Sequence, residues 1–216
     1  MRKKVTNIKK QTVIIASCAM IFILAVIGLS FFLTRKINQD NDQLNHPGEH
    51  HENQSVYEQK FNDLLGKQPP DFTLYSYDNS KIILSEQKGK KVVLFFTEGV
   101  MCYPSCWNQI AAFGKDEIFK REDTIVFSIV VDTKNEWKKA IDKMPELGAT
   151  TVLFDSSKTI SKEYGVLSLP SSMHKGQYPG HTYLILDKDG VVRFTKDDPQ
   201  MAVRNDELKT ELEKLN

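Results

Sequence analysis

One stretch decides the fold of this chain: Val92-Val93-Leu94-Phe95-Phe96-Thr97-Glu98-Gly99-Val100-Met101-Cys102-Tyr103-Pro104-Ser105-Cys106-Trp107. Its first five residues are β-branched, aliphatic or aromatic, as in a strand that is buried on both faces. A loop with a glycine follows, and a helical pattern begins after it. Pro104 suits the first position of a helix, where its missing N–H costs nothing. We therefore expect Cys102 just before a helix and Cys106 in the first turn of that helix.

This position favours reactive cysteines. Unpaired N–H groups and the positive end of the helix dipole stabilise a thiolate at the start of a helix. A pair this close in sequence closes a small loop and stabilises little through chain entropy, so reversible chemistry explains it better than a purely structural disulfide does. Cys102 and Cys106 are therefore the predicted catalytic residues.

The charge of the chain is distributed unevenly. Its 216 residues carry a formal net charge of +1, which gives no reason to expect binding to nucleic acid. An uncharged apolar stretch at residues 13–33 is long enough to cross a hydrocarbon core of about 30 Å. The basic residues before it are Arg2, Lys3, Lys4, Lys9 and Lys10, against Arg35 and Lys36 close behind it. We expect a single-pass anchor in the cell membrane, with a cytoplasmic N-terminus and the later residues outside.

Two kinds of processing compete with a retained anchor. A secretory signal usually ends in small residues, whereas this segment ends Ser30-Phe31-Phe32-Leu33-Thr34-Arg35, which favours retention. Residues 15–18, Ile-Ala-Ser-Cys, resemble the lipobox of bacterial lipoproteins. The apolar run before them is too short for that role and continues beyond Cys18, to which we assign no function.

Four segments follow from these patterns. We expect a cytoplasmic basic tail at 1–12, a transmembrane anchor at 13–34, a flexible polar linker at 35–59 and a folded domain at 60–216. The linker has no sustained apolar period and is predicted to be a tether. It contains His46, His50 and His51, which are able to bind a metal transiently, although a solvated spacer is the simpler interpretation.

Strand and helix patterns alternate through the folded domain. Residues 72–76 and 81–84 predict a small hairpin. Further strands are expected at 91–97, 124–131 and 151–154, helices at 106–113, 135–143 and 157–164, a second hairpin at 182–187 and 191–194, and a C-terminal helix at 205–215. This order predicts an α/β fold in which a mixed central sheet carries helices on both faces.

Segments along the domain resemble a known family in content and order. They are residues 66–74, 88–96, 129–132, 154–166 and 183–192, together with the loop that holds Cys102 and Cys106, called the cysteine loop below. Together they resemble the thioredoxin-like superfamily and, within it, the peroxiredoxin-like AhpC/TSA or redoxin family. The resemblance implies a thioredoxin-like fold and a thiol-dependent oxidoreductase with antioxidant activity and a redox-active disulfide. It also implies a peroxide or a disulfide-bearing protein as substrate and a separate electron donor, without an organic cofactor.

The chain departs from that family at two places. A typical peroxiredoxin carries Thr or Ser three residues before its peroxidatic cysteine and Arg at the start of a late strand. Here Tyr103 stands three residues before Cys106, Gly99 stands three before Cys102, and His181 takes the place of the Arg. The nucleophile stays open, because counting from the strand favours Cys106 and analogy with thioredoxin favours Cys102. Disulfide reductase and peroxidase are both compatible with this pattern.

A weaker similarity, to the Sco-type copper chaperones, gives the alternative function. Those anchored thioredoxin folds bind copper through a Cys-x-x-x-Cys motif and a distant His. Cys102, Cys106 and His181 supply these residue types in that order. Two soft sulfurs and one imidazole suit copper, Cu(I) especially, and Met101 and Met173 are compatible with it. A third possibility is an interaction domain with an inert disulfide.

Four residues are candidates for supporting roles. His181 opens the strand that we expect beside the cysteine loop. Tyr103 and Pro104 lie between the two cysteines. Glu98 either accepts a proton near the thiols or, in the interpretation we favour, is an exposed loop carboxylate.

Neighbouring residues receive simpler interpretations. His174 lies in an insertion rich in Pro and Gly, which is expected to be an ordered loop over the site. Asp132 ends a strand at the sheet edge where sites gather, although capping of the next helix explains it equally well. Trp107 and Phe113 are expected in the core.

Overall fold

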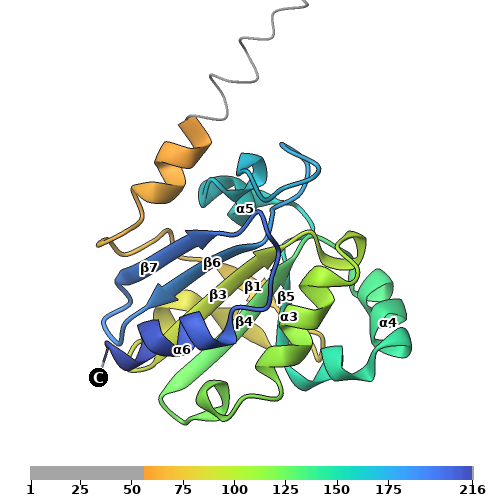
Figure 1. The fold of residues 1–216 in the computed structure, drawn as a ribbon, viewed down its shortest axis with the longest axis horizontal. Helices are drawn as coiled ribbons and strands as arrows, with labels where there is room; N and C mark the ends of the chain where they lie inside the picture. The colour runs from red at the N-terminus through yellow and green to blue at the C-terminus, as the bar shows by residue number, and fades with distance from the viewer. Residues whose placement is uncertain (1–55, 216) are drawn as a thin grey trace, which may run out of the picture. The chain divides into compact units, whose positions relative to one another are not determined.

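A mixed five-stranded sheet forms the centre of the domain. The computed structural model describes residues 56–215. The strand order is β5-β4-β3-β6-β7. Strands β3 (Lys91–Thr97), β4 (Thr124–Val130) and β5 (Thr151–Phe154) are parallel, whereas β6 (Thr182–Leu186) and β7 (Val192–Asp197) run antiparallel to their neighbours. This is the mixed sheet that the sequence predicts (Figure 1).

Helices follow the parallel strands in the predicted order. They are α3 (Ser105–Phe113), α4 (Lys134–Lys143), α5 (Thr159–Glu163) and the C-terminal α6 (Asn205–Glu213), and residues 56–62 are also helical. Short 3-10 helices are η1 (Leu84–Gln87), η2 (Gly99–Met101), η3 (Glu117–Lys120), η4 (Pro145–Ala149) and η5 (Val166–Ser168). Strands β1 (Thr73–Tyr75) and β2 (Lys81–Ile83) form the small antiparallel hairpin expected from residues 72–84.

The alternation of β3 divides the core into two clusters. Val93 and Phe95 pack in a cluster with buried residues of α3, α4 and α6. Val92, Leu94 and Phe96 pack in a second cluster with residues of α5, of the 56–62 helix and of the β1–β2 hairpin. Successive side chains of a strand point to opposite faces, so a strand that is apolar at every position must be covered on both. The predicted helices on both faces are therefore confirmed.

The pairing of β3 with β6 determines where the functional residues meet. These strands are antiparallel, and Phe96 lies opposite Thr182. The end of β3, which leads into the cysteine loop, therefore lies beside the start of β6. His181 directly precedes β6, so its side chain is brought next to cysteines that lie far from it in the sequence.

Residues 56–215 contain no helix long and apolar enough to cross a bilayer. The predicted basic tail and the predicted anchor lie outside the described residues, as do Cys18 and the histidines of the linker.

Candidate active site

The two cysteines are joined where β3 passes into α3. Cys102 follows the 3-10 turn η2, and its N–H donates to Gly99 O over 3.2 Å. Cys106 is the second residue of α3, and its N–H donates to Cys102 O over 3.0 Å. Their Sγ atoms form a disulfide of 2.06 Å. The predicted position of the cysteines is correct, but Pro104 precedes the first residue of α3 instead of occupying it, and its peptide bond with Tyr103 is cis.

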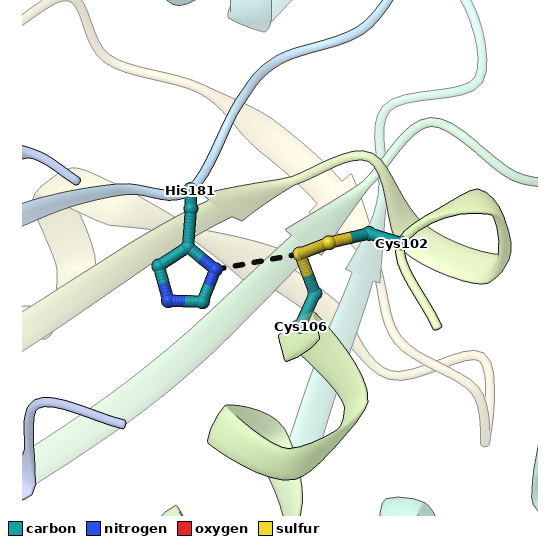
Figure 2. A group of neighbouring side chains, drawn as sticks. All are labelled: Cys102, Cys106 and His181. Atoms are coloured by element: carbon teal, nitrogen blue, oxygen red, sulfur yellow. Dashed lines mark hydrogen bonds between the residues drawn. A yellow bond between two sulfur atoms is a disulfide. The ribbon is translucent and has the colours of Figure 1, made fainter. Parts of the chain in front are cut away.

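His181 lies against the disulfide, as its place before β6 predicts. Its Nδ1 atom is 3.4 Å from Cys106 Sγ (Figure 2). The imidazole is fully buried, Cys106 is 0% exposed and Cys102 only 3%. Burial lowers the pKa of His181 to about 4, because an imidazolium loses hydration there, so the ring is neutral at pH 7.

The hydrogen bonds of His181 determine which ring nitrogen carries the proton. Nε2 lies 3.2 Å from Ala202 O and 2.6 Å from the Tyr183 hydroxyl. A carbonyl oxygen only accepts hydrogen bonds, so Nε2 is the protonated nitrogen. The lone pair of Nδ1 therefore points at Cys106.

Tyr183 continues this chain of hydrogen bonds to α3. Its hydroxyl donates to Gln109 Oε1 over 2.9 Å. The same oxygen accepts the Arg204 N–H over 2.7 Å, while Gln109 Nε2 donates to Asn205 Oδ1 over 2.9 Å, which fixes the orientation of the amide. Since the Tyr183 proton goes to Gln109, the Tyr183 oxygen accepts from His181. The network thus holds His181 as a neutral proton acceptor for a Cys106 thiol.

Tyr183 and Gln109 were missed in the sequence, although each carries a signal. Tyr183 lies in β6, two residues after His181, which directly precedes the strand. Residues at this spacing along an extended segment share a face. Gln109 is a polar residue, 0% exposed, on the buried face of α3, three positions after Cys106. A buried amide requires hydrogen-bond partners, which is a reason to place such a residue near a site.

Glu98 is not the exposed loop carboxylate that we favoured. It is fully buried, and its Oε1 accepts the N–H groups of Met173 and His174 over 2.7 and 3.2 Å. Its Oε2 lies 3.1 Å from His174 Nδ1. The interpretation failed because the loop that buries Glu98 comes from residues far along the chain. Glu98 thus ties the insertion at 169–180 to the cysteine loop.

Asp132 also supports the cysteine loop. Its Oδ2 accepts the Val100 N–H over 3.0 Å, and a Cβ on Gly99 would lie 1.7 Å from that oxygen. Gly99 has a φ of 66°, so both its conformation and its surroundings require glycine. The alternative of helix capping is wrong for Asp132, because Thr133 caps α4 through the Glu136 N–H.

Tyr103 and Pro104 form part of a surface groove beside the disulfide. The groove is also lined by Val100, Trp107 and Met144. Tyr103 is 69% exposed, and its ring packs edge-to-face on Trp107, with 5.0 Å between the ring centroids. Tyr103 thus presents an aromatic surface next to Cys102.

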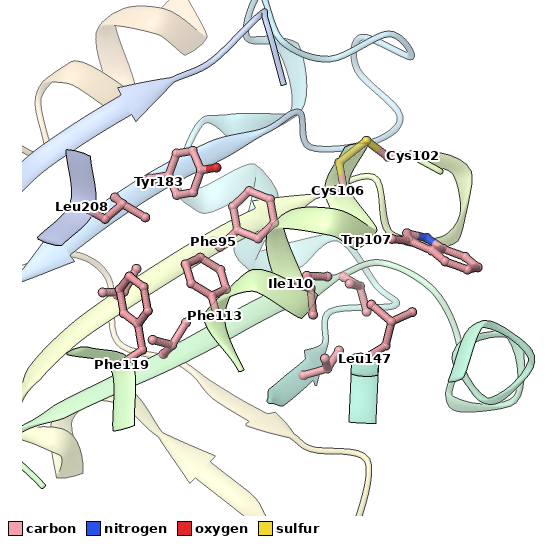
Figure 3. Packing of buried hydrophobic residues seen from close by; sticks show 14 of the residues in the cluster. Phe95, Cys102, Cys106, Trp107, Ile110, Phe113, Phe119, Leu147, Tyr183 and Leu208 are labelled. Atoms are coloured by element: carbon pink, nitrogen blue, oxygen red, sulfur yellow. A yellow bond between two sulfur atoms is a disulfide. The ribbon is translucent and has the colours of Figure 1, made fainter. Parts of the chain in front are cut away.

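The core around the site contains the aromatic residues that the sequence assigns to it. Trp107 and Phe113 are buried in one cluster with both cysteines, as predicted (Figure 3). The Phe95 ring stacks on Tyr183 at 4.8 Å and contacts the His181 ring at 4.7 Å. The site is therefore built on the hydrophobic core and not on the surface.

We predict that Tyr183→Phe slows the formation of the disulfide from the reduced protein by about tenfold, because proton acceptors of this kind contribute about 100-fold or more when fully removed. Tyr164→Phe is the matched control, since Tyr164 is equally buried on the other face of the sheet and donates to Pro70 O. Each change should cost about 1 kcal/mol of stability. Stopped-flow oxidation by peroxide measures the rates. Equal slowing in both variants would show that Tyr183 has only a structural role.

We predict that ionisation of Asp132 destabilises the protein as the pH rises from about 4 to 6. Burial raises the pKa of Asp132 to about 6, against an ordinary value of 3.8, while the hydrogen bond from Val100 partly opposes the shift. Between these values Asp132 binds more protons in the folded protein than in the unfolded chain, so its ionisation costs up to about 3 kcal/mol above pH 6. The lowered pKa of His181 acts in the opposite direction over this range, equally in the parent protein and in a variant of Asp132.

Asp132→Asn removes this cost and keeps an acceptor for Val100. Urea unfolding at pH 4.5 and 7.5 measures the free energy of unfolding of both proteins. Relative to the parent protein, the variant should be more stable at pH 7.5 than at pH 4.5. Asp63→Asn, at an exposed position, serves as the control. No change in the pH dependence with Asp132→Asn would contradict the assignment.

Comparison with known proteins places the chain in a family. The AhpC/TSA family profile matches residues 65–195. Chloroplastic peroxiredoxin Q of Suaeda salsa is 36% identical over 132 residues, which cover 60% of this chain and 58% of that protein. Its counterpart from Sedum lineare is 37% identical over 130 residues, with 60% and 66% covered. The chain thus spans about three fifths of the length of these relatives. Peroxiredoxin-2 of Mus musculus is 32% identical over 147 residues, with 61% and 68% covered.

Solved structures show the same fold. A peroxiredoxin-like protein from Aquifex aeolicus superposes with a TM-score of 0.58 at 21% identity, over 70% of this chain and 87% of that one. The reduced 2-Cys peroxiredoxin of Plasmodium vivax gives 0.56 at 25% identity, over 68% and 78%. Because the profile covers more than half of the chain, the chain belongs to the AhpC/TSA family and has the peroxiredoxin-like thioredoxin fold.

Proposed function

We propose that this protein is a thiol-dependent peroxidase in which Cys106 attacks the peroxide and Cys102 resolves the product. One observation carries the proposal: within an AhpC/TSA domain, the Cys102–Cys106 pair forms a disulfide whose Cys106 Sγ lies 3.4 Å from a neutral imidazole nitrogen. A dithiol that closes in this way next to a proton acceptor has the parts needed for a reversible redox cycle.

Position and contacts favour Cys106 as the nucleophile. It lies in the first turn of α3, whose N-terminus no side chain caps, so the helix dipole favours a thiolate on this residue. His181 Nδ1 contacts Cys106 Sγ, where its lone pair accepts a hydrogen bond from the reduced thiol. Cys102 lies before the helix and contacts the thioether of Met201 instead.

The cycle balances in three steps. The Cys106 thiolate attacks one peroxide oxygen, the O–O bond breaks, and the leaving oxygen takes a proton to give water or an alcohol. The Cys102 thiolate then attacks the sulfur of the resulting sulfenic acid, the S–O bond breaks as the disulfide forms, and the leaving hydroxide takes a proton to give water. A dithiol reductant then supplies two electrons and two protons by exchange, and its own sulfurs become a disulfide.

The low exposure of both sulfurs supports a peroxide over a bulky disulfide as the substrate of the first step. Cys106 is 0% exposed and Cys102 only 3%. A peroxide requires little space, whereas a protein disulfide must bring a sulfur in line with the attacking thiolate. The reductant has easier access at Cys102, because its neighbours Met101 and Tyr103 are exposed.

Single cysteine variants test the proposal. With one equivalent of peroxide, reduced Cys102→Ser should form a sulfenic acid on Cys106, detected by mass spectrometry after dimedone labelling. Cys106→Ser should lose at least about 100-fold in the peroxide reaction. The reverse pattern would make Cys102 the nucleophile. If neither variant differs from the parent protein in peroxide consumption, the peroxidase proposal is wrong.

We also propose that residues 13–34 anchor the protein in the cell membrane, with the AhpC/TSA domain outside the cytoplasm. The proposal is supported by the length of the apolar segment and by the basic residues before it. Fusion of a reporter enzyme that is active only outside the cytoplasm to the C-terminus tests it. An inactive fusion would contradict the orientation. Release of the protein from the membrane by alkaline carbonate would contradict the anchor.

Copper binding is the second candidate function. It is favoured by the distances between the donor atoms of Cys102, Cys106 and His181, which all lie within 4.8 Å of one another. A free Nδ1 lone pair and two soft sulfurs suit Cu(I) once the disulfide is reduced. Stoichiometric Cu(I) uptake by the reduced protein, lost in the Ser variants and in His181→Ala, is the expected result. Uptake that survives these substitutions would exclude this site.

A further inference from the structure

The turn between β7 and α6 presents two groups to the active site at once. Ala202 O accepts the hydrogen bond from His181 Nε2. The preceding residue, Met201, places its thioether Sδ 3.9 Å from Cys102 Sγ. The Met201 sulfur thus contacts the same disulfide that His181 contacts at Cys106, although Met201 lies far from both cysteines in the sequence.

The conformation of Met201 is unusual and is maintained by its neighbours. Its φ of 50° lies in the left-handed region, which a residue with a long side chain rarely adopts. Asp198 supports the turn, since its carbonyl accepts the Met201 N–H and its carboxylate accepts the Ala202 N–H. The Arg204 guanidinium holds that carboxylate with two hydrogen bonds. A strained backbone conformation that is held by its neighbours in this way is typical of functional sites.

The spacing of the donor atoms fits a tetrahedral metal. With metal–sulfur bonds of about 2.3 Å and metal–nitrogen bonds of about 2.0 Å, two sulfurs lie about 3.8 Å apart and a sulfur and a nitrogen about 3.5 Å apart. Cys102 Sγ and Met201 Sδ are 3.9 Å apart, and Cys106 Sγ and His181 Nδ1 are 3.4 Å apart. Two opposite edges of the tetrahedron are therefore present while the disulfide is closed. Reduction of the disulfide lets the two cysteine sulfurs move apart from 2.06 Å, as the edge between them requires.

We infer that Met201 is the fourth ligand of a Cu(I) site formed by Cys102, Cys106 and His181 in the reduced protein. This inference rests on the second candidate function. Two thiolates and one imidazole also suit Zn(II), whereas a thioether is a soft ligand that favours Cu(I). Met201 thus makes the donor set selective for Cu(I) over Zn(II).

Metal binding is coupled to the redox state of the pair. A dithiol reductant gives two electrons and two protons to the Cys102–Cys106 disulfide and is itself oxidised to a disulfide. Cu(I) then binds the two sulfurs and displaces their protons, with no change in its own oxidation state. The oxidised protein lacks two of the four ligands, so it should not hold the ion.

Two other methionines near the cysteines in sequence provide matched controls. Met101 is 52% exposed and Met173 is 63% exposed. Their places in the sequence are compatible with a copper site, but both residues are exposed at the surface. Met173 contacts Glu98 through its backbone N–H. Met201, which the sequence does not single out, contacts the Cys102 sulfur.

The test is a Cu(I) competition titration of the reduced full-length protein against bicinchoninate, with a parallel Zn(II) titration. The parent protein should bind one Cu(I). Met201→Leu keeps the size of the side chain and should weaken Cu(I) binding by about tenfold, which corresponds to about 1.4 kcal/mol. Zn(II) binding should not change, and Met101→Leu and Met173→Leu should bind both ions as the parent protein does.

A second measurement needs no substitution at Met201, so its result does not depend on whether the Met201→Leu variant folds. In protein labelled with selenomethionine, the selenium absorption edge should show a copper neighbour at bonding distance when Cu(I) is bound. Tight Cu(I) binding without that neighbour, and with Met201→Leu unaffected, would overturn the role of Met201 and leave the copper function intact. Failure of the parent protein to bind Cu(I) would instead overturn the copper function itself.

Discussion

The antiparallel pairing of β3 with β6 is the constraint on which the site depends. It brings the cysteine loop, which follows β3, beside His181, which precedes β6. The register places Phe95 opposite Tyr183, and the stacking of these two rings fixes the strand positions from within the core. Because a shift by one residue would turn His181 to the opposite face, the hydrophobic pattern of two strands sets the distance between a sulfur and an imidazole.

A buried hydrogen-bond network determines which nitrogen of His181 carries the proton at this contact. The hydrogen bonds from His181 through Tyr183 to Gln109 leave the Nδ1 lone pair facing Cys106, and burial keeps the ring neutral. Such networks are costly unless every member has a partner, which explains why Gln109 receives two donors and gives one proton to Asn205. The same lone pair serves proton transfer in a redox cycle and ligation of a soft metal, so one geometry supports both candidate functions.

The sequence predicts the fold well and the site in part. Its periodicities located the strands and helices because burial on one or both faces leaves a local pattern. Cys102, Cys106 and His181 could be proposed together because the order of the elements predicts which strand ends are neighbours. The burial of Glu98 depends on a loop more than seventy residues away, and the contact of Met201 with Cys102 depends on a turn of unusual backbone conformation, so neither has a local signal.

The reduction potential of the Cys102–Cys106 pair tests most directly whether it is a redox centre. The protein should be equilibrated in dithiol and disulfide buffers, and the reduced fraction counted by alkylation and mass spectrometry, with circular dichroism as a control for the fold. We predict one reversible transition at a potential above about −300 mV, with the fold retained, because structural disulfides of secreted proteins typically fall below that value. A pair that resists reduction until the protein unfolds would contradict the account.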